Sequence, residues 1–105
     1  MELEIHQTEE GGKSVITVRG EVDLYSSPRL RDAVTKAAAK GNGDIHVDLK
    51  GVPYMDSSGV ATLVEGFRAA NDKKKQFVLL APSQAVLKVL QLSRLDSVFV
   101  IREDA

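Results

Sequence analysis

The sequence contains no cysteine and no tryptophan, and only 5% of its 105 residues are aromatic. The absence of cysteine excludes disulfide scaffolds and metal sites built from thiolates. Because aromatic residues are scarce, a buried core has to consist mainly of Val, Leu, Ile and Ala. Hydrophobic residues make up 43% of the chain and charged residues 28%, which is ordinary for a globular domain. We therefore expect one domain spanning residues 1–105.

The sequence also lacks long apolar runs and a large net charge, and both absences bear on where the protein is located and what it binds. No apolar run approaches the length of about 18 residues that a membrane span needs, and the acidic, alternating start of the chain does not resemble a signal peptide. The 14 basic and 15 acidic residues nearly cancel, to a net charge of -1. This balance gives no electrostatic reason to expect binding to nucleic acid or to an anionic membrane. A cytoplasmic location is expected.

Hydrophobic periodicity predicts an alternating order of strands and helices. Strands are expected at residues 2–7, 14–19, 44–50, 77–80 and 98–101, and helices at residues 28–40, 57–71 and from 82–83 onward. Ser27 is expected to cap the first helix and Gly41 to end it. A glycine turn predicts a hairpin of the first two strands, and the later alternation predicts parallel strand pairs. The expected fold class is α/β.

Residues suited to catalysis are few. His6 and His46 fall at alternating positions of predicted strands, where we expect both to be exposed, and their spacing is not that of a metal pair. The sequence has neither a phosphate-binding glycine loop nor the glycine-flanked serine of hydrolases. No histidine is placed to activate Ser57 or Ser58 as a nucleophile. We expect no enzyme activity, no metal site and no cofactor.

The unusual feature is the run Asp56, Ser57, Ser58 and Gly59 before a predicted helix. One interpretation is purely structural, because Asp and Ser are preferred helix caps and Gly59 relieves crowding in the first turn. The functional interpretation uses the same geometry: a phosphate on a serine at a helix N-terminus faces free amides and the positive end of the helix dipole. Phosphorylation there adds about -1.5 to -2 charges. It would change a surface without unfolding the domain.

Asp23 is a second candidate, at the junction between the second predicted strand and the first helix. It is either a capping or turn residue or part of a binding surface, and we expect this junction to lie at the same end of the sheet as the Asp56 loop. Tyr25 and Tyr54 flank the two loops and either pack or bind.

Three segments together resemble the anti-sigma factor antagonists, the single-domain STAS proteins of bacteria. They are residues 20–23 (GEVD), residues 48–52 (DLKGV) and residues 54–59 (YMDSSG), and the resemblance covers the full chain. It implies a mixed, mostly parallel β-sheet with helices packed mainly on one face. It also implies that the unphosphorylated protein binds an anti-sigma factor serine kinase and thereby releases the sigma factor.

The resemblance also assigns roles to residues. It implies phosphorylation at Ser57, with Ser58 as the alternative acceptor, and a partner-binding surface formed by Asp23, Tyr25, Asp56, Ser57, Ser58 and Gly59. A metal-dependent serine phosphatase of the PP2C type would reset the protein, and ATP and magnesium would belong to the kinase.

Several positions depart from the family pattern. Val60 and Ala61 follow the serine run where the family often has Leu and Gly, and Arg94 stands where a glycine is common. The alternative function is a constitutive STAS adaptor, for instance a subunit of a lipid transporter or a stress-signalling scaffold, without phosphoregulation. Small-ligand binding between the loops is a third class, without a phosphate-loop motif to support it.

Overall fold

In the part of the chain that the structure describes, five strands and three helices follow one another, and they alternate after the opening pair of strands. A computed structural model describes residues 3–40 and 43–103. The elements follow in the order β1 (Glu4–Glu10), β2 (Lys13–Arg19), α1 (Ser27–Lys40), β3 (Ile45–Gly51), α2 (Ser57–Asp72), β4 (Phe77–Leu80), α3 (Gln84–Leu92) and β5 (Val100–Arg102). The predicted order is confirmed.

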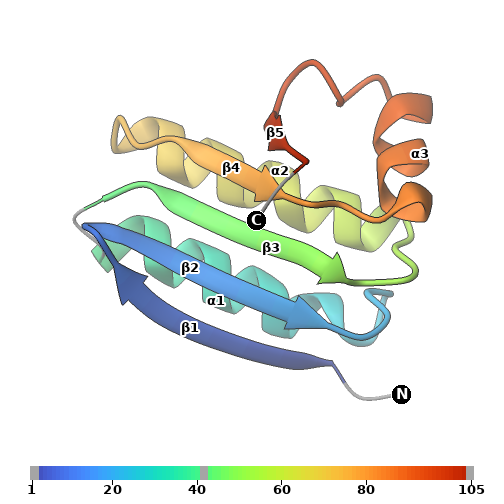
Figure 1. Ribbon diagram of the computed structural model, residues 1–105, viewed down its shortest axis with the longest axis horizontal. Coiled ribbons are helices and arrows are strands. Elements are labelled where there is room, and N and C mark those ends of the chain that lie inside the picture. Colours follow the sequence, from blue (N-terminus) through green and yellow to red (C-terminus); the bar gives the residue numbers. More distant parts are fainter. Residues whose placement is uncertain (1–2, 41–42, 104–105) are drawn as a thin grey trace.

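The strands form one sheet in the order β1-β2-β3-β4-β5, in which only the β1–β2 pair is antiparallel. Helices α1 and α2 lie side by side behind the sheet, and α3 lies beside the ends of β3 and β4 (Figure 1). This arrangement confirms the expected mixed, mostly parallel sheet with helices mainly on one face. It also sends the ends of β2 and β3 toward the same edge, where the loops that lead to α1 and α2 begin.

The opening hairpin is longer than the sequence pattern predicts. Glu10 pairs with Lys13 across a two-residue turn, in which Gly11 and Gly12 have φ angles of 57° and 79°. Two successive positive φ angles suit glycine and match the twist of a hairpin. β1 therefore runs to Glu10, whereas Glu2 of the predicted strand lies outside the described residues.

The core lies between the sheet and the two parallel-running helices, and it is aliphatic as the composition predicts. Side chains at alternate positions of β2, β3 and β4 meet the apolar stripes of α1 and α2. The fully buried members include Ile16, Val18, Ile45, Val47, Leu49, Leu79, Leu30, Val34 and Leu63. Phe99 joins two aromatic contacts in this core, because its ring centroid lies 5.8 Å from that of Phe67 and 6.1 Å from that of Phe77.

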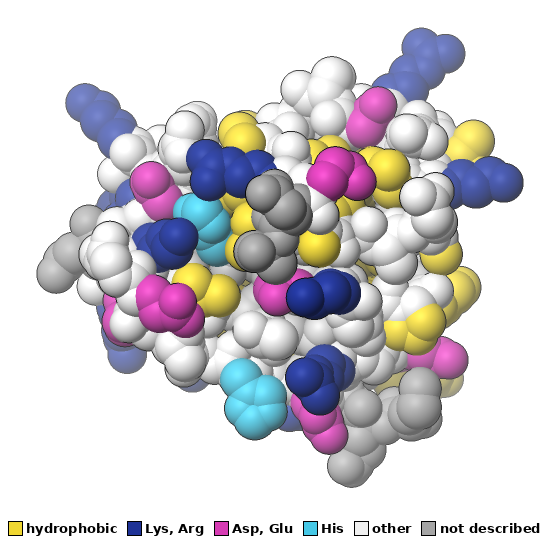
Figure 2. All heavy atoms as spheres, viewed as in Figure 1, with side chains coloured by type: hydrophobic (Ala, Val, Ile, Leu, Met, Phe, Trp, Pro, Cys, Tyr) yellow, Lys and Arg dark blue, Asp and Glu magenta, His cyan; other side chains and the backbone are white. Residues whose placement is uncertain are grey.

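The two histidines lie on strands of the sheet, and the predicted exposure is wrong for one of them. Figure 2 shows the second face of the sheet, where charged side chains of both signs surround hydrophobic ones. His6 is exposed as predicted, but His46 is buried in the central strand β3, where its partners in the neighbouring strands are Val15 and Val78. Burial lowers the pKa of His46 below 6.5, and the nearby charges of Lys13 and Arg102 lower it further, against a smaller opposing effect of Asp44.

Some element boundaries also differ from prediction. Ser27 is the first residue of α1 and not its cap, and the predicted end of that helix at Gly41 lies outside the described residues. β5 begins at Val100 and ends at Arg102, slightly later than expected. Within residues 3–40 and 43–103, no helix is both long and apolar enough to cross a membrane.

Candidate functional site

Asp56 caps helix α2. Its backbone is extended, with φ -100° and ψ -171°, and its Oδ1 accepts hydrogen bonds from the amide of Ser58 at 2.9 Å and from that of Gly59 at 3.3 Å. Two amides that would otherwise lack a partner at the helix start are thus satisfied. The capping role that the sequence suggested for the aspartate is confirmed.

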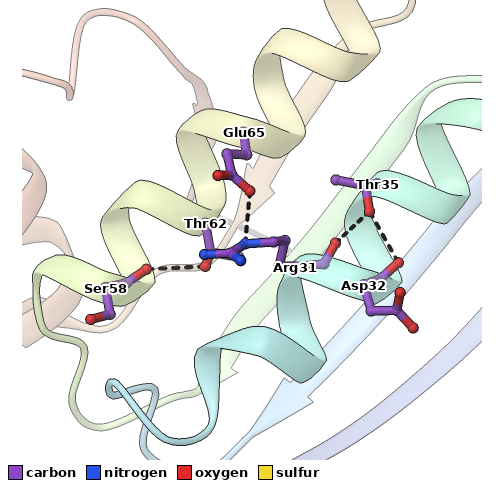
Figure 3. Close-up of polar contacts among 6 residues, drawn as sticks. All are labelled: Arg31, Asp32, Thr35, Ser58, Thr62 and Glu65. Atoms are coloured by element: carbon purple, nitrogen blue, oxygen red, sulfur yellow. Dashed lines mark hydrogen bonds and ion pairs between the residues drawn. The ribbon is translucent and has the colours of Figure 1, made fainter.

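The two serines after the cap differ in exposure. Ser57 is exposed at the first position of α2, whereas Ser58 is half-buried. The carbonyl oxygen of Ser58 accepts a hydrogen bond of 3.0 Å from Oγ1 of the buried Thr62, one turn later in the helix (Figure 3). Of the two hydroxyls, that of Ser57 is therefore the more accessible to an enzyme acting from outside.

Gly59 is buried, because the first turn of α2 lies directly on the preceding loop. A Cβ atom at this position would lie 2.5 Å from Cγ of Met55 and 2.8 Å from Cγ1 of Val22. Both neighbours are themselves buried, so neither side chain can move into solvent. The glycine is what allows α2 to start this close to the sheet edge.

Asp23 organises the loop between β2 and α1. Its Oδ1 accepts hydrogen bonds from the amides of Tyr25 at 2.9 Å and Ser26 at 3.0 Å, and its own amide donates to Oγ of Ser26 at 2.9 Å. The hydrogen bonds that the carboxylate accepts, that from the Ser26 amide first, lower the pKa of Asp23 below 3.8, against a smaller opposing effect of desolvation. The amide-accepting side chain ahead of α1 is therefore Asp23, and not Ser27 as predicted.

The Asp23 loop and the Asp56 loop are joined by backbone hydrogen bonds. Val22 and Met55 form a parallel bridge, in which the amide of Val22 donates to the carbonyl of Tyr54 at 3.0 Å and the amide of Asp56 donates to the carbonyl of Val22 at 3.1 Å. The prediction that both loops lie at one end of the sheet is confirmed, and Figure 1 shows them together beyond the ends of β2 and β3.

Large apolar side chains surround this edge. Tyr25 is 89% exposed, Leu24 is 65% exposed and Tyr54 is 49% exposed. Tyr25, for which packing and binding were both open, therefore does not pack into the domain. Leu24 was missed at the sequence level, where the signal available was a large hydrophobic residue inside an otherwise polar loop.

An ion pair links the two helices next to the site. Nε of Arg31 in α1 lies 2.8 Å from Oε2 of Glu65 in α2, and both side chains are about half exposed (Figure 3). An exposed pair of this kind contributes little to stability, typically about 0–1 kcal/mol. Here the pair joins the solvent-facing sides of α1 and α2.

Comparison with known proteins agrees with the resemblance in the sequence. Residues 5–102 match the family described as "Mlab, STAS domain". The anti-sigma-B factor antagonist of Staphylococcus aureus (strain NCTC 8325) is 30% identical over 103 residues, which cover 98% of this chain and 95% of that protein.

Solved structures share the fold. An anti-sigma factor antagonist from Mycobacterium paratuberculosis superposes with a TM-score of 0.86 at 24% identity, over 95% of this chain and 85% of that one. The phosphorylated form of the Bacillus cell fate determinant SpoIIAA gives a TM-score of 0.71 at 25% identity, over 94% of this chain and 89% of that one. The chain therefore belongs to the STAS domain family, and the Staphylococcus aureus protein that it resembles over nearly its whole length is an anti-sigma-B factor antagonist.

Proposed function

We propose that this protein is an anti-sigma factor antagonist whose binding is switched by phosphorylation at Ser57. The unphosphorylated form binds an anti-sigma factor serine kinase and thereby releases the sigma factor. The observation that carries the proposal is the exposed hydroxyl of Ser57 at the first position of α2, directly after the capping carboxylate of Asp56.

The local charges explain why a phosphate would act as a switch. A phosphate on Ser57 brings about -1.5 to -2 charges to a position that follows one carboxylate, Asp56, and adjoins the loop that carries another, Asp23. Asp56 already accepts the amides of Ser58 and Gly59, so these donors are not free to neutralise the new group. A partner surface fitted to a neutral hydroxyl then meets a concentrated negative charge, and like charges across an interface cost several kcal/mol.

The fold tolerates this modification. Ser57 is exposed and its side chain is not part of the buried core, and negative charge is favourable at a helix N-terminus. Phosphorylation is therefore expected to alter the surface and leave the sheet and helices intact. Gly59 contributes by holding the first turn of α2 against Met55 and Val22, which fixes where Ser57 is presented.

The proposal includes the partners and setting of the cycle. The kinase supplies ATP and magnesium, a PP2C-type serine phosphatase removes the phosphate, and the whole cycle takes place in the cytoplasm. This chain acts by binding and performs no catalysis. Nucleic acid and membrane are not among its partners, in keeping with the nearly balanced charge of the sequence.

The test is phosphorylation by the anti-sigma factors of the source organism, each purified and incubated with this protein and Mg-ATP. We expect intact-mass spectrometry to show one added phosphate and fragmentation to place it on Ser57. Ser57→Ala should remain unmodified, and the matched variant Ser58→Ala should be modified like the wild type. Phosphate retained in Ser57→Ala would move the acceptor to Ser58. No phosphate with any of these kinases would favour the constitutive adaptor.

A further inference from the structure

Two apolar side chains next to the proposed switch lie almost entirely in solvent. Leu24 is 65% exposed and Tyr25 is 89% exposed, and they are adjacent in the loop between β2 and α1. Tyrosine is one of the three residue types enriched among the side chains that dominate protein–protein binding energies. Within the domain, the two side chains contribute little to the buried core.

The loop that carries them is rigidly held. Asp23 accepts the amides of Tyr25 and Ser26 through one carboxylate oxygen, and Oγ of Ser26 donates to the carbonyl of Glu21 at 2.9 Å. The amide of Ser27 donates to the carbonyl of Asp23 at 2.8 Å, which fixes the loop to the start of α1. Apolar groups on a loop that is already ordered bind with a smaller entropy cost, because little freedom is lost on association.

The same loop is fixed relative to Ser57. The Val22–Met55 bridge joins it to the Asp56 loop, from which the half-exposed Tyr54 adds a second aromatic side chain. The apolar group and the phosphoacceptor thus lie on two loops that backbone hydrogen bonds join at one end of the sheet.

We infer that Leu24 and Tyr25 are the anchor of the partner interface: they supply most of the binding energy, while Ser57 determines only whether binding is permitted. This inference rests on the proposed function and adds the residues that determine affinity. The partner is expected to offer an apolar pocket for the two side chains. Because the Val22–Met55 bridge joins the loop of the anchor to the Asp56 loop, a partner that holds the two side chains also faces Ser57.

The test compares the affinities of four unphosphorylated proteins for the anti-sigma factor, among those of the source organism, that binds the wild type. They are the wild type, Leu24→Ala, Tyr25→Ala and the double variant, measured by isothermal titration calorimetry. The double variant should bind at least about 30-fold more weakly, with an unchanged melting temperature. The matched control is Leu92→Ala at the end of α3, where the side chain is 76% exposed, and its affinity should stay within about twofold of the wild type.

The outcomes separate the inference from the function on which it rests. Wild-type affinity in the double variant would overturn the anchor and leave the phosphoswitch standing. A wild type that binds none of the anti-sigma factors would overturn the proposed function and the anchor with it. If the double alanine variant melts below the wild type, Leu24→Gln with Tyr25→Gln takes its place, since glutamine retains a long side chain and replaces the apolar end by a polar amide.

Discussion

Substitution of Gly59 by alanine tests how closely the first turn of α2 lies on the sheet edge. The added Cβ would lie 2.5 Å from Cγ of Met55 and 2.8 Å from Cγ1 of Val22, and both neighbours are fully buried. Overpacking in a core typically costs about 1–3 kcal/mol. The higher helix propensity of alanine returns at most about 1 kcal/mol. We therefore expect Gly59→Ala to be less stable than the wild type by about 1–2 kcal/mol.

The assay is thermal unfolding followed by circular dichroism, supported by urea unfolding. For a domain of this size, the loss corresponds to a decrease of about 5–15 °C in melting temperature. Ala61→Gly provides the matched control, because Ala61 is exposed in the same helix and reports propensity without a packing change. It should cost up to about 1 kcal/mol. If Gly59→Ala melts at or above the wild-type temperature, the close packing described for this turn is refuted.

Two further predictions concern Asp56 and His46. Asp56→Ala should destabilise the protein by about 1 kcal/mol, because the amides of Ser58 and Gly59 lose their acceptor. Urea unfolding measures this loss. Asp56→Asn keeps an acceptor oxygen and should restore most of the stability. The pKa of His46 in the folded protein lies below 6.5, so the unfolded chain binds a proton at this residue more readily than the folded one. The free energy of unfolding should therefore decrease as the pH falls from about 6.5 toward the pKa of the folded protein. His46→Gln should remove this dependence in the same pH range, and an unchanged slope would contradict the assignment.

Local sequence patterns are sufficient to predict most of the fold. Alternation at Ile45, Val47 and Leu49 reflects one buried face of a strand, and the stripe that includes Leu30 and Val34 reflects one buried face of a helix. The capping role of Asp56 follows from the preference of aspartate for that position. These features depend on residues close together in the chain, and so they can be recognised without knowledge of the tertiary structure.

The parts that sequence reasoning missed depend on contacts between distant residues. His46 was expected to be exposed by alternation, but it is buried in a strand that has neighbours on both sides, with Val15 and Val78 as its partners. The bridge between Val22 and Met55 joins segments more than thirty residues apart, and no local pattern reports it. Consequently, the sequence was sufficient to suggest candidate residues for the site. The hydrogen bonds that join the two loops and the exposure of Leu24 could be recognised only in the structure.

The most direct test of the central claim compares one protein in two phosphorylation states. The chain is prepared without phosphate and with phosphoserine incorporated at position 57, and each form is titrated against the anti-sigma factor that binds the unphosphorylated protein. We expect the phosphate to weaken binding by at least about 100-fold, with circular dichroism showing the same fold in both forms. Equal affinities of the two forms would contradict the switch and reduce Ser57 to the first residue of a capped helix.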